Sequence, residues 1–136
     1  MAVLDEKDYL MRLIKEVVRA LFSIAFGKKF VSVELERENK YEVSGKDFND
    51  FLKMADLGLI NEAENLLLDG IDYTDKEEVM AAALFYQYLS EKDPDFLTAN
   101  NYSLEEVLEG LRDLMEESGY RDMFDLMDEG GMGHHE

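Results

Sequence analysis

Apolar side chains recur along this chain in helical patterns that glycines and short polar stretches interrupt. Such patterns are typical of helices that bury one face. Ser, Thr, Asp and Asn stand before most of the apolar segments, where they can cap a helix start, and glycines follow, where they can end a helix. The sequence predicts six helices, at about residues 5–26, 46–57, 61–69, 75–91, 104–118 and 121–129.

Single residues mark where these helices begin and end. Asp5 can cap the first helix and Ser44 the second, whereas Gly27 and Gly58 can end them in the left-handed conformation that other residues avoid. Three further starts have the capping-box spacing, in which glutamate follows the capping residue by three positions: Asn61–Glu64, Thr74–Glu77 and Ser103–Glu106. The glycines that follow later helices are Gly70, Gly119, Gly130 and Gly131.

Two segments between the predicted helices have other patterns. Residues 30–43, FVSVELERENKYEV, alternate apolar and polar side chains around a polar turn. This favours a short β-hairpin, although a short helix or an irregular arm is also compatible. Residues 92–102 contain Asp93–Pro94, and the proline disfavours helical backbone at Asp93. This segment is therefore predicted to be a link.

The first predicted helix is apolar over most of its surface. Its polar side chains fall on one narrow stripe, which leaves apolar residues on more than one side. Such a helix is predicted to be a central core helix or, alternatively, a surface for self-association. A membrane-bound amphipathic helix fits less well because the polar face is narrow. The residues nominated for self-association are Leu10, Leu13, Val17, Leu21 and Phe22.

The segment GLINEAENLLLDG, residues 58–70, has the pattern of the second helix in a packed helical hairpin. Gly58 would lie in the turn, and Ala63 at a crossing where a small side chain lets two helix backbones approach. The hairpin is similar to a tetratricopeptide-type repeat, but no second copy follows about 34 residues later. The sequence therefore predicts an all-α domain of stacked antiparallel hairpins over residues 1–129, with a C-terminal tail at 130–136.

A wider resemblance covers nearly the whole chain apart from residues 30–45 and those after Tyr120. The segments EKDYLMRLIKEVVRALFSIAFGK, INEAENLL, ALFYQYLS and NYSLEEVLEGLRDL occur in this order. Together they resemble a family of short cytoplasmic bacterial proteins of unassigned function. The resemblance implies an all-helical fold and carries no catalytic residue.

Charge narrows the partners that the chain can bind. The 136 residues carry a formal net charge of −18. Residues 1–29 hold six basic and four acidic side chains, a net charge of +2, whereas residues 30–136 hold eight basic and 28 acidic ones, a net charge of −20. Such a field repels nucleic acid and anionic membranes, so we expect neither as a partner. Cationic partners are favoured instead.

Several absent features are consistent with the cytoplasm. The chain has no cysteine, which removes disulfides, thiolate catalysis and thiolate metal ligands. Asp5, Glu6 and Asp8 stand where a secretory signal would carry basic residues. No apolar run approaches the ~18–20 residues of a membrane helix. We therefore expect a cytoplasmic protein.

Candidate catalytic and metal sites are few. The only histidines, His134 and His135, lie in the terminal GGMGHHE, where a mobile tail or a remnant of a purification sequence is a simpler interpretation than a metal site. Three aspartates before Gly130 are spaced three residues apart, which is a helix face and not a calcium loop. No phosphate-binding glycine loop and no Gly-x-Ser-x-Gly motif occurs. We expect no catalytic residue, metal or cofactor.

Two apolar clusters are candidate partner surfaces, with helix core as the alternative for both. One is aromatic and the other is rich in methionine, whose flexible side chain adapts to varied partners. They comprise Phe85, Tyr86 and Tyr88 in the first, and Met115, Met123, Phe124 and Met127 in the second.

The leading functional hypothesis is a non-catalytic protein–protein interaction module or small adaptor that self-associates as a homo-oligomer. An acidic mimic of nucleic acid that blocks a DNA-binding protein is the alternative, and an enzyme with an unrecognised carboxylate site is the third hypothesis.

Overall fold

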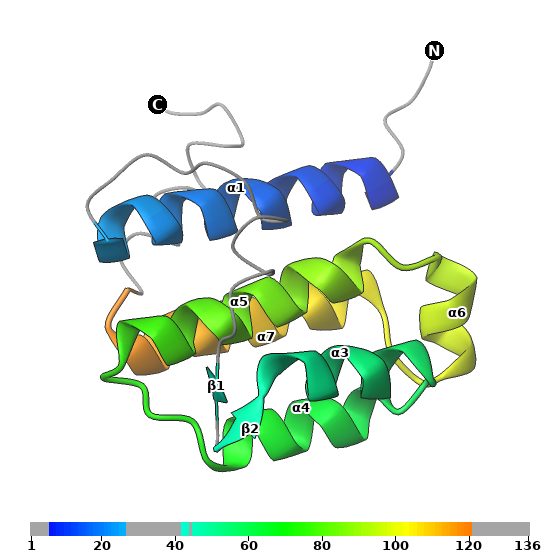
Figure 1. Cartoon of the computed structure of the whole chain (residues 1–136). Coiled ribbons are helices and arrows are strands. Elements are labelled where there is room, and N and C mark those ends of the chain that lie inside the picture. Colours follow the sequence, from blue (N-terminus) through cyan, green and yellow to red (C-terminus); the bar gives the residue numbers. More distant parts are fainter. Residues whose placement is uncertain (1–5, 27–41, 44, 121–136) are drawn as a thin grey trace, which may run out of the picture.

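Six helices and one two-stranded sheet make up the part of the chain that the structure, a computed structural model, describes: residues 6–26, 42–43 and 45–120 (Figure 1). The helices are α1 (Glu6–Phe26), α3 (Phe48–Asp56), α4 (Ile60–Asp69), α5 (Lys76–Ser90), α6 (Pro94–Ala99) and α7 (Leu104–Ser118). The strands are β1 (Glu42–Val43) and β2 (Lys46–Asp47). The predicted helical fold is confirmed, whereas tetratricopeptide-like stacking stays a prediction.

Helix α5 is the centre of this fold. Every residue from Val79 to Gln87 is buried, and so are Leu89 and Ser90. Helices α1, α7 and α3 and strand β1 all contact α5, and Figure 1 shows α5 between α1 and the α3–α4 pair. A helix that is apolar on all sides is covered on all sides. The central position that the sequence suggested for the first helix therefore belongs to α5, and the suggestion was wrong.

Helix α1 buries one face only. Its buried side chains follow the spacing of a single helical stripe and lie against α5 and α7. The opposite face carries exposed polar side chains, among them Arg12, Lys15 and Glu16. All five residues nominated for self-association belong to the buried stripe, which corrects that nomination: Leu10, Leu13, Val17, Leu21 and Phe22.

The hairpin of α3 and α4 has the turn that the sequence predicts. Gly58 has a φ of +86°, and its amide donates to the carbonyl of Ala55 at 3.0 Å. Ala63 is fully buried, as a close helix crossing requires. The predicted capping box is wrong, because Leu59 occupies the cap position without a side-chain bond and Asn61 donates to the carbonyl of Asn101 at 3.3 Å.

At α7 the predicted residues do set both helix ends, whereas at α5 the capping residue is the neighbour of the predicted one. Ser103 caps α7, accepting from the Glu106 amide at 3.1 Å, and Gly119 ends that helix with a φ of +92°. Both predictions are confirmed. The cap of α5 is Asp75 instead of Thr74, because Thr74 donates its hydroxyl to Asp72. An aspartate is the stronger capping residue of the two.

Helix α6 lies in the segment that was predicted to be a link. Asp93 has extended backbone and caps α6, accepting from the Asp95 amide at 2.8 Å. Pro94 occupies the first turn, where its missing N–H has no intrahelical partner to lose. The proline thus begins a helix as well as preventing one at Asp93, so the prediction of a link was wrong.

The short sheet lies at one end of the predicted arm. Val43 pairs with Lys46 and Glu42 with Asp47, across a turn in which Gly45 has a φ of +73°. Helix α3 therefore begins at Phe48, two residues later than predicted, with Asp47 as its cap. Residues 30–41, the helix predicted at 121–129, the tail at 130–136 and the predicted ends at Asp5, Gly27 and Ser44 lie outside the described residues.

Replacing Gly58 by valine should lower the free energy of unfolding more than the same change at Gly119. Both positions have positive φ, which costs an L-residue about 1–2 kcal/mol. A Cβ on Gly58 would also lie 2.5 Å from Oδ1 of Asn100, whereas nothing lies within 4 Å of one on Gly119. Urea unfolding of the two variants measures the difference. Equal losses would show that the contact with Asn100 has no cost.

Replacing Ala63 by phenylalanine should destabilise the chain by about 1–3 kcal/mol, because the ring overpacks the buried α3–α4 contact. The matched control is Leu66→Phe on the same helix, where the side chain is 43% exposed and the larger ring has room. Thermal melts compare the two. If both variants match the parent, Ala63 does not lie at a tight crossing.

Candidate functional site

Three of the nominated partner residues lie in the core. Phe85, Tyr86 and Met115 have no exposed surface, and the two aromatic rings pack edge to face with centroids 5.7 Å apart. They are therefore not available to a partner, and the core alternative is correct for them. Met123, Phe124 and Met127 lie outside the described residues.

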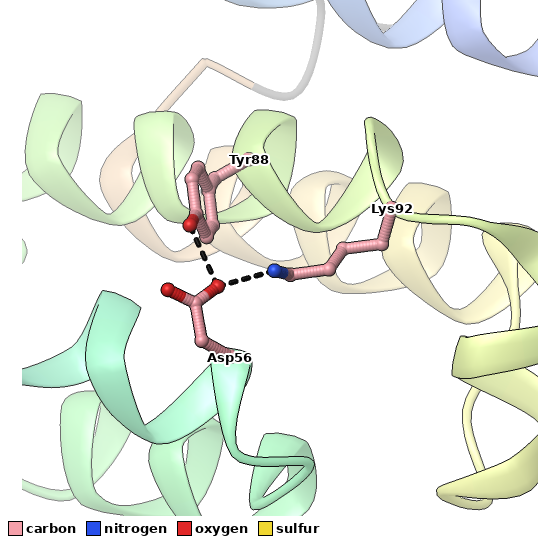
Figure 2. A network of polar contacts seen from close by, with 3 residues as sticks. All are labelled: Asp56, Tyr88 and Lys92. Carbon is pink, nitrogen blue, oxygen red and sulfur yellow. Dashed lines mark hydrogen bonds and ion pairs between the residues drawn. The ribbon is translucent and has the colours of Figure 1, made fainter.

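Tyr88, the remaining nominated residue, belongs to a polar network between α3 and α5 (Figure 2). Its hydroxyl donates to Oδ1 of Asp56 at 2.7 Å, and Nζ of Lys92 pairs with the same oxygen. The Lys92 ammonium also lies 4.7 Å from the centroid of the Tyr88 ring. Tyr88 thus ties the end of α3 to the end of α5.

The charge of Asp56 is stabilised by this network. Partial burial raises the pKa of the carboxyl, but the hydrogen bonds from Lys92 and Tyr88 and the charge of Lys92 outweigh it, so the pKa is lowered overall. Because the Asp56 side chain is 49% exposed, solvent screens the ion pair and its contribution to stability is small. The network has the geometry of a structural contact between two helices.

An open cavity of about 280 Å³ lies between α4 and α7. Helix α4 contributes Asn61 and Glu64 to its lining, and Tyr102 comes from the segment between α6 and α7. The residues from α7 are Glu106, Glu109, Gly110 and Asp113. Four of the seven lining residues are acidic and none is basic, so this cavity has the chemistry of a cation-binding site. We call it the acidic cleft.

The carboxylates of the acidic cleft are not arranged as a metal centre. Among the residues that the structure describes, no group of three or more acidic or histidine side chains is close enough together to hold a metal ion. A divalent cation needs several oxygens at about 2.0–2.6 Å. The negative charge here is spread along the cleft instead.

Two tyrosines, Tyr86 and Tyr102, lie close to the Glu64 side chain. The hydroxyl of Tyr86, from α5, donates to Oε2 of Glu64 at 2.7 Å. Gly110 makes room for this ring, because a Cβ on Gly110 would lie 2.5–2.7 Å from three atoms of the Tyr86 ring and hydroxyl. Because Gly110 has no side chain, the Tyr86 ring has the space that it needs to reach Glu64.

Tyr102 is the second of these tyrosines. Its side chain is 4% exposed, and its hydroxyl lies against the Glu64 carboxylate, although the contact lacks the geometry of a full hydrogen bond. Burial, then the negative charge of Glu64 and the contact of the hydroxyl with its carboxylate, and last the charge of Glu106 raise the pKa of Tyr102 far above its usual value. The same two causes, burial first and Glu64 second, raise the pKa of Tyr86. Both hydroxyls therefore stay protonated and face a carboxylate.

Comparison with known proteins assigns the chain to a family. A family model described as a family of unknown function, DUF6483, matches residues 4–119. The chain belongs to DUF6483. The match confirms the resemblance that the sequence showed to a family of unassigned function. No curated protein and no solved structure shows significant similarity to the chain.

In this DUF6483 chain, sequence reasoning missed the acidic cleft. Glu64 was assigned to a capping box, and Tyr102 and Gly110 were not singled out. The cleft combines residues from α4, from the segment between α6 and α7 and from α7, so no single helical pattern reveals it. None of the helices in the described residues is long and apolar enough to cross the membrane.

The same substitution should have unequal effects on stability at the two tyrosines. Tyr86→Phe removes a hydrogen bond to a charged acceptor and should lower the free energy of unfolding by about 1–3 kcal/mol. Tyr102→Phe removes a hydroxyl whose contact with the same carboxylate lacks full hydrogen-bond geometry, so it should lower the free energy of unfolding less. Urea unfolding measures both. Equal losses of stability in the two variants would show that both hydroxyls are hydrogen-bonded to Glu64 to the same degree.

Proposed function

We propose that this DUF6483 chain is a non-catalytic protein–protein interaction module that acts in the cytoplasm and binds a basic partner through the acidic cleft. The observation that carries the proposal is the lining of the cleft, in which four carboxylates and no cation surround an open cavity. Uncompensated charge of one sign attracts a partner of the opposite sign and raises the rate of encounter.

The surface around the cleft supports the same partner chemistry. The solvent side of α7 carries one arginine among a series of exposed carboxylates, which are Glu105, Glu106, Glu109, Asp113, Glu116 and Glu117. This acidic face extends the cleft along the length of the helix. A basic segment of a partner can therefore contact both the cleft and its rim.

The acidic mimic of nucleic acid remains the second candidate, and the row of carboxylates along α7 is the observation that favours it. Both candidates bind a basic protein, but the mimic must also displace DNA from that protein. A competition assay with the captured partner and its DNA distinguishes them. Self-association stays a prediction, which the molar mass from light scattering at micromolar concentration tests.

Affinity capture with matched charge variants tests the proposal. The cleft variant combines Glu106→Gln, Glu109→Gln and Asp113→Asn, which remove three charges and keep side-chain size. Captured proteins are identified by mass spectrometry at physiological ionic strength. We expect basic proteins that bind the parent to be lost from the cleft variant.

The control variant removes the same number of charges from other elements, with Asp8→Asn, Glu16→Gln and Glu91→Gln. These three residues are exposed and lie on α1 or at the end of α5. The control should retain the partners that the cleft variant loses. Equal capture by both variants, or equal loss from both, would show that the acidic cleft is not the binding surface.

A further inference from the structure

We propose that copies of this chain bind one another head to tail, with the solvent face of α1 in one copy packed against the α3–α4 hairpin of the next. The contact joins two surfaces that lie outside the acidic cleft. The basic row is the set of exposed cations on α1, and the leucine surface is the set of exposed leucines on the hairpin. They comprise Arg12, Lys15 and Arg19 in the first, and Leu57, Leu59 and Leu66 in the second. The inference goes beyond the proposed function, because it names a second copy as a partner and does not use the cleft.

The leucine surface is the largest group of exposed apolar side chains in the described part of the chain. Leu57, Leu59 and Leu66 are 76%, 41% and 43% exposed, and they are three of the four large apolar residues that are exposed among the described residues. Leu57 and Leu59 flank Gly58 in the turn of the hairpin. Leu59 and Leu66 are seven positions apart, so they lie on the same side of α4. Exposed leucines that gather on one hairpin are typical of a surface that binds a protein.

Carboxylates border the leucine surface, and they set the charge of what can cover it. Glu62, Leu66 and Asp69 follow one another at spacings of four and three residues, so they share one stripe of α4, and all three are exposed. This helix carries three acidic side chains and no basic one. Two identical leucine surfaces would bring these like charges together, which disfavours a two-fold contact between them. The favoured occupant is an exposed face with positive charge.

The solvent face of α1 has that charge. Four basic and three acidic side chains give α1 a net charge of +1, whereas each of the other described helices is net negative. The three cations of the basic row are spaced three and four residues apart, which places them on one stripe of the helix. A second copy therefore offers the leucine surface a complementary face.

The charges on the two helices also have the same spacing. Arg12 and Arg19 are seven positions apart, and so are Glu62 and Asp69. Each pair therefore spans about 10.5 Å along its helix, at a rise of about 1.5 Å per residue. When the two helices run antiparallel, Arg19 lies opposite Glu62 and Arg12 lies opposite Asp69.

The same antiparallel register brings apolar side chains together. Counted along the helices, Lys15 falls opposite Leu66, and its aliphatic stem can cover the leucine while its ammonium stays in water. Ile24 is the fourth exposed large apolar residue of the described chain, at 54% exposure, and it falls at the level of Leu57. One register thus matches both the charges and the exposed apolar side chains.

Helix α7 is the other acidic surface that the basic row could contact. It carries six acidic side chains and one basic one, but none of the exposed large apolar residues of the described chain lies on it. Exposed ion pairs contribute little to affinity, whereas burial of apolar surface is the main driving force of association. The α3–α4 hairpin offers both kinds of contact, so it is the better site.

The position of the two surfaces makes this a contact between copies. Helix α5 lies between α1 and the α3–α4 pair, so the basic row and the leucine surface are on opposite sides of the molecule (Figure 1). A contact between two different surfaces leaves one of each unused at the ends of the assembly. Further copies can therefore add, and the assembly does not stop at two.

The experiment measures the molar mass of the full chain by light scattering, from about 10 µM to about 500 µM at physiological ionic strength. We expect the mass of the parent to rise with concentration beyond that of a dimer. One variant, Arg12→Glu with Lys15→Glu, reverses the charge of the basic row. A second, Leu57→Ser with Leu66→Ser, removes two leucines. All four side chains are exposed, so circular dichroism should match the parent.

Each variant alone should be monomeric where the parent assembles, with a dissociation constant raised about tenfold or more. Mixed in equal amounts, each variant supplies the surface that the other lacks. Because both outer ends of such a pair are blocked, we expect a species of two copies and none larger. This rescue by mixing would not occur if both variants had simply lost their fold.

Two controls should assemble as the parent does. Lys46→Glu with Lys76→Glu makes the same change of charge at exposed positions on β2 and α5. The cleft variant described above leaves both surfaces intact. Loss of assembly in either control would overturn the inference, as would a parent that stays monomeric or stops at a dimer, or a mixture that stays monomeric. None of these masses reports on capture of a basic protein by the acidic cleft, so the two proposals fail separately.

Discussion

Replacing Gly110 by alanine should lower the free energy of unfolding by about 1–3 kcal/mol, although alanine is the better helix former. In an exposed helix this change would gain about 1 kcal/mol. Here the new Cβ would lie 2.5 Å from a carbon of the Tyr86 ring. That ring is fully buried and held by Glu64, so it cannot move away cheaply, and the overpacking cost exceeds the gain in helix propensity.

A double-mutant cycle tests the cause of this loss. In a Tyr86→Leu background the atoms that the new Cβ would meet are absent, so Gly110→Ala should cost little or should stabilise the chain. Urea unfolding of the parent, both single variants and the double variant gives the coupling energy between the two positions. Equal cost of Gly110→Ala in both backgrounds would show that Tyr86 is not the obstacle.

Local rules predicted several helix ends well, but they missed the cap of α5 and the helix that begins at Pro94. Gly58 and Gly119 have the positive φ expected of them, and Ser103 caps α7 as its capping box predicts. The capping box at Asn61–Glu64 has the same spacing but does not form. Glu64 accepts a hydrogen bond from Tyr86 instead, and Asn61 donates one to the carbonyl of Asn101. A side chain with a tertiary partner does not have to cap its own helix.

Burial was harder to predict than helicity. The first helix and α5 both have long apolar runs, but only α5 is buried on all sides. The difference lies in the neighbours, since α1, α3, α7 and β1 all pack against α5. Aromatic residues such as Phe85 and Tyr86 therefore became core and not a partner surface, which the pattern of one helix could not decide.

The acidic cleft was even harder to predict from the sequence than burial, because the fold brings its residues together. Glu64 and Tyr86 are 22 positions apart in sequence and meet through one hydrogen bond. Tyr102 belongs to no local motif, and its burial beside Glu64 is set by the fold. The excess of negative charge was visible in the sequence, and it predicted a cationic partner, but its position on α7 and α4 required the structure.

Raising the pH above about 10 should unfold this chain through Tyr86 and Tyr102. In the unfolded chain both hydroxyls ionise near their usual pKa of 10.0, whereas burial and the charge of Glu64 raise the pKa of both in the folded chain. The folded state then holds more protons than the unfolded state, so stability is complete below pH 10 and falls as pH rises. Each tyrosine contributes about 1.4 kcal/mol per pH unit, which makes roughly 3 kcal/mol per unit for two.

A decrease in stability of roughly 3 kcal/mol per pH unit is large compared with the roughly 5–15 kcal/mol by which folded domains are stable. Guanidinium unfolding followed by circular dichroism at several pH values between 9 and 12 measures it, and absorbance at 295 nm follows tyrosine ionisation. The double variant Tyr86→Phe, Tyr102→Phe removes both ionisations, so its stability should depend far less on pH, even though its stability at pH 8 differs from that of the parent. The same slope in parent and double variant would show that these two buried hydroxyls ionise in the folded chain as readily as in the unfolded one.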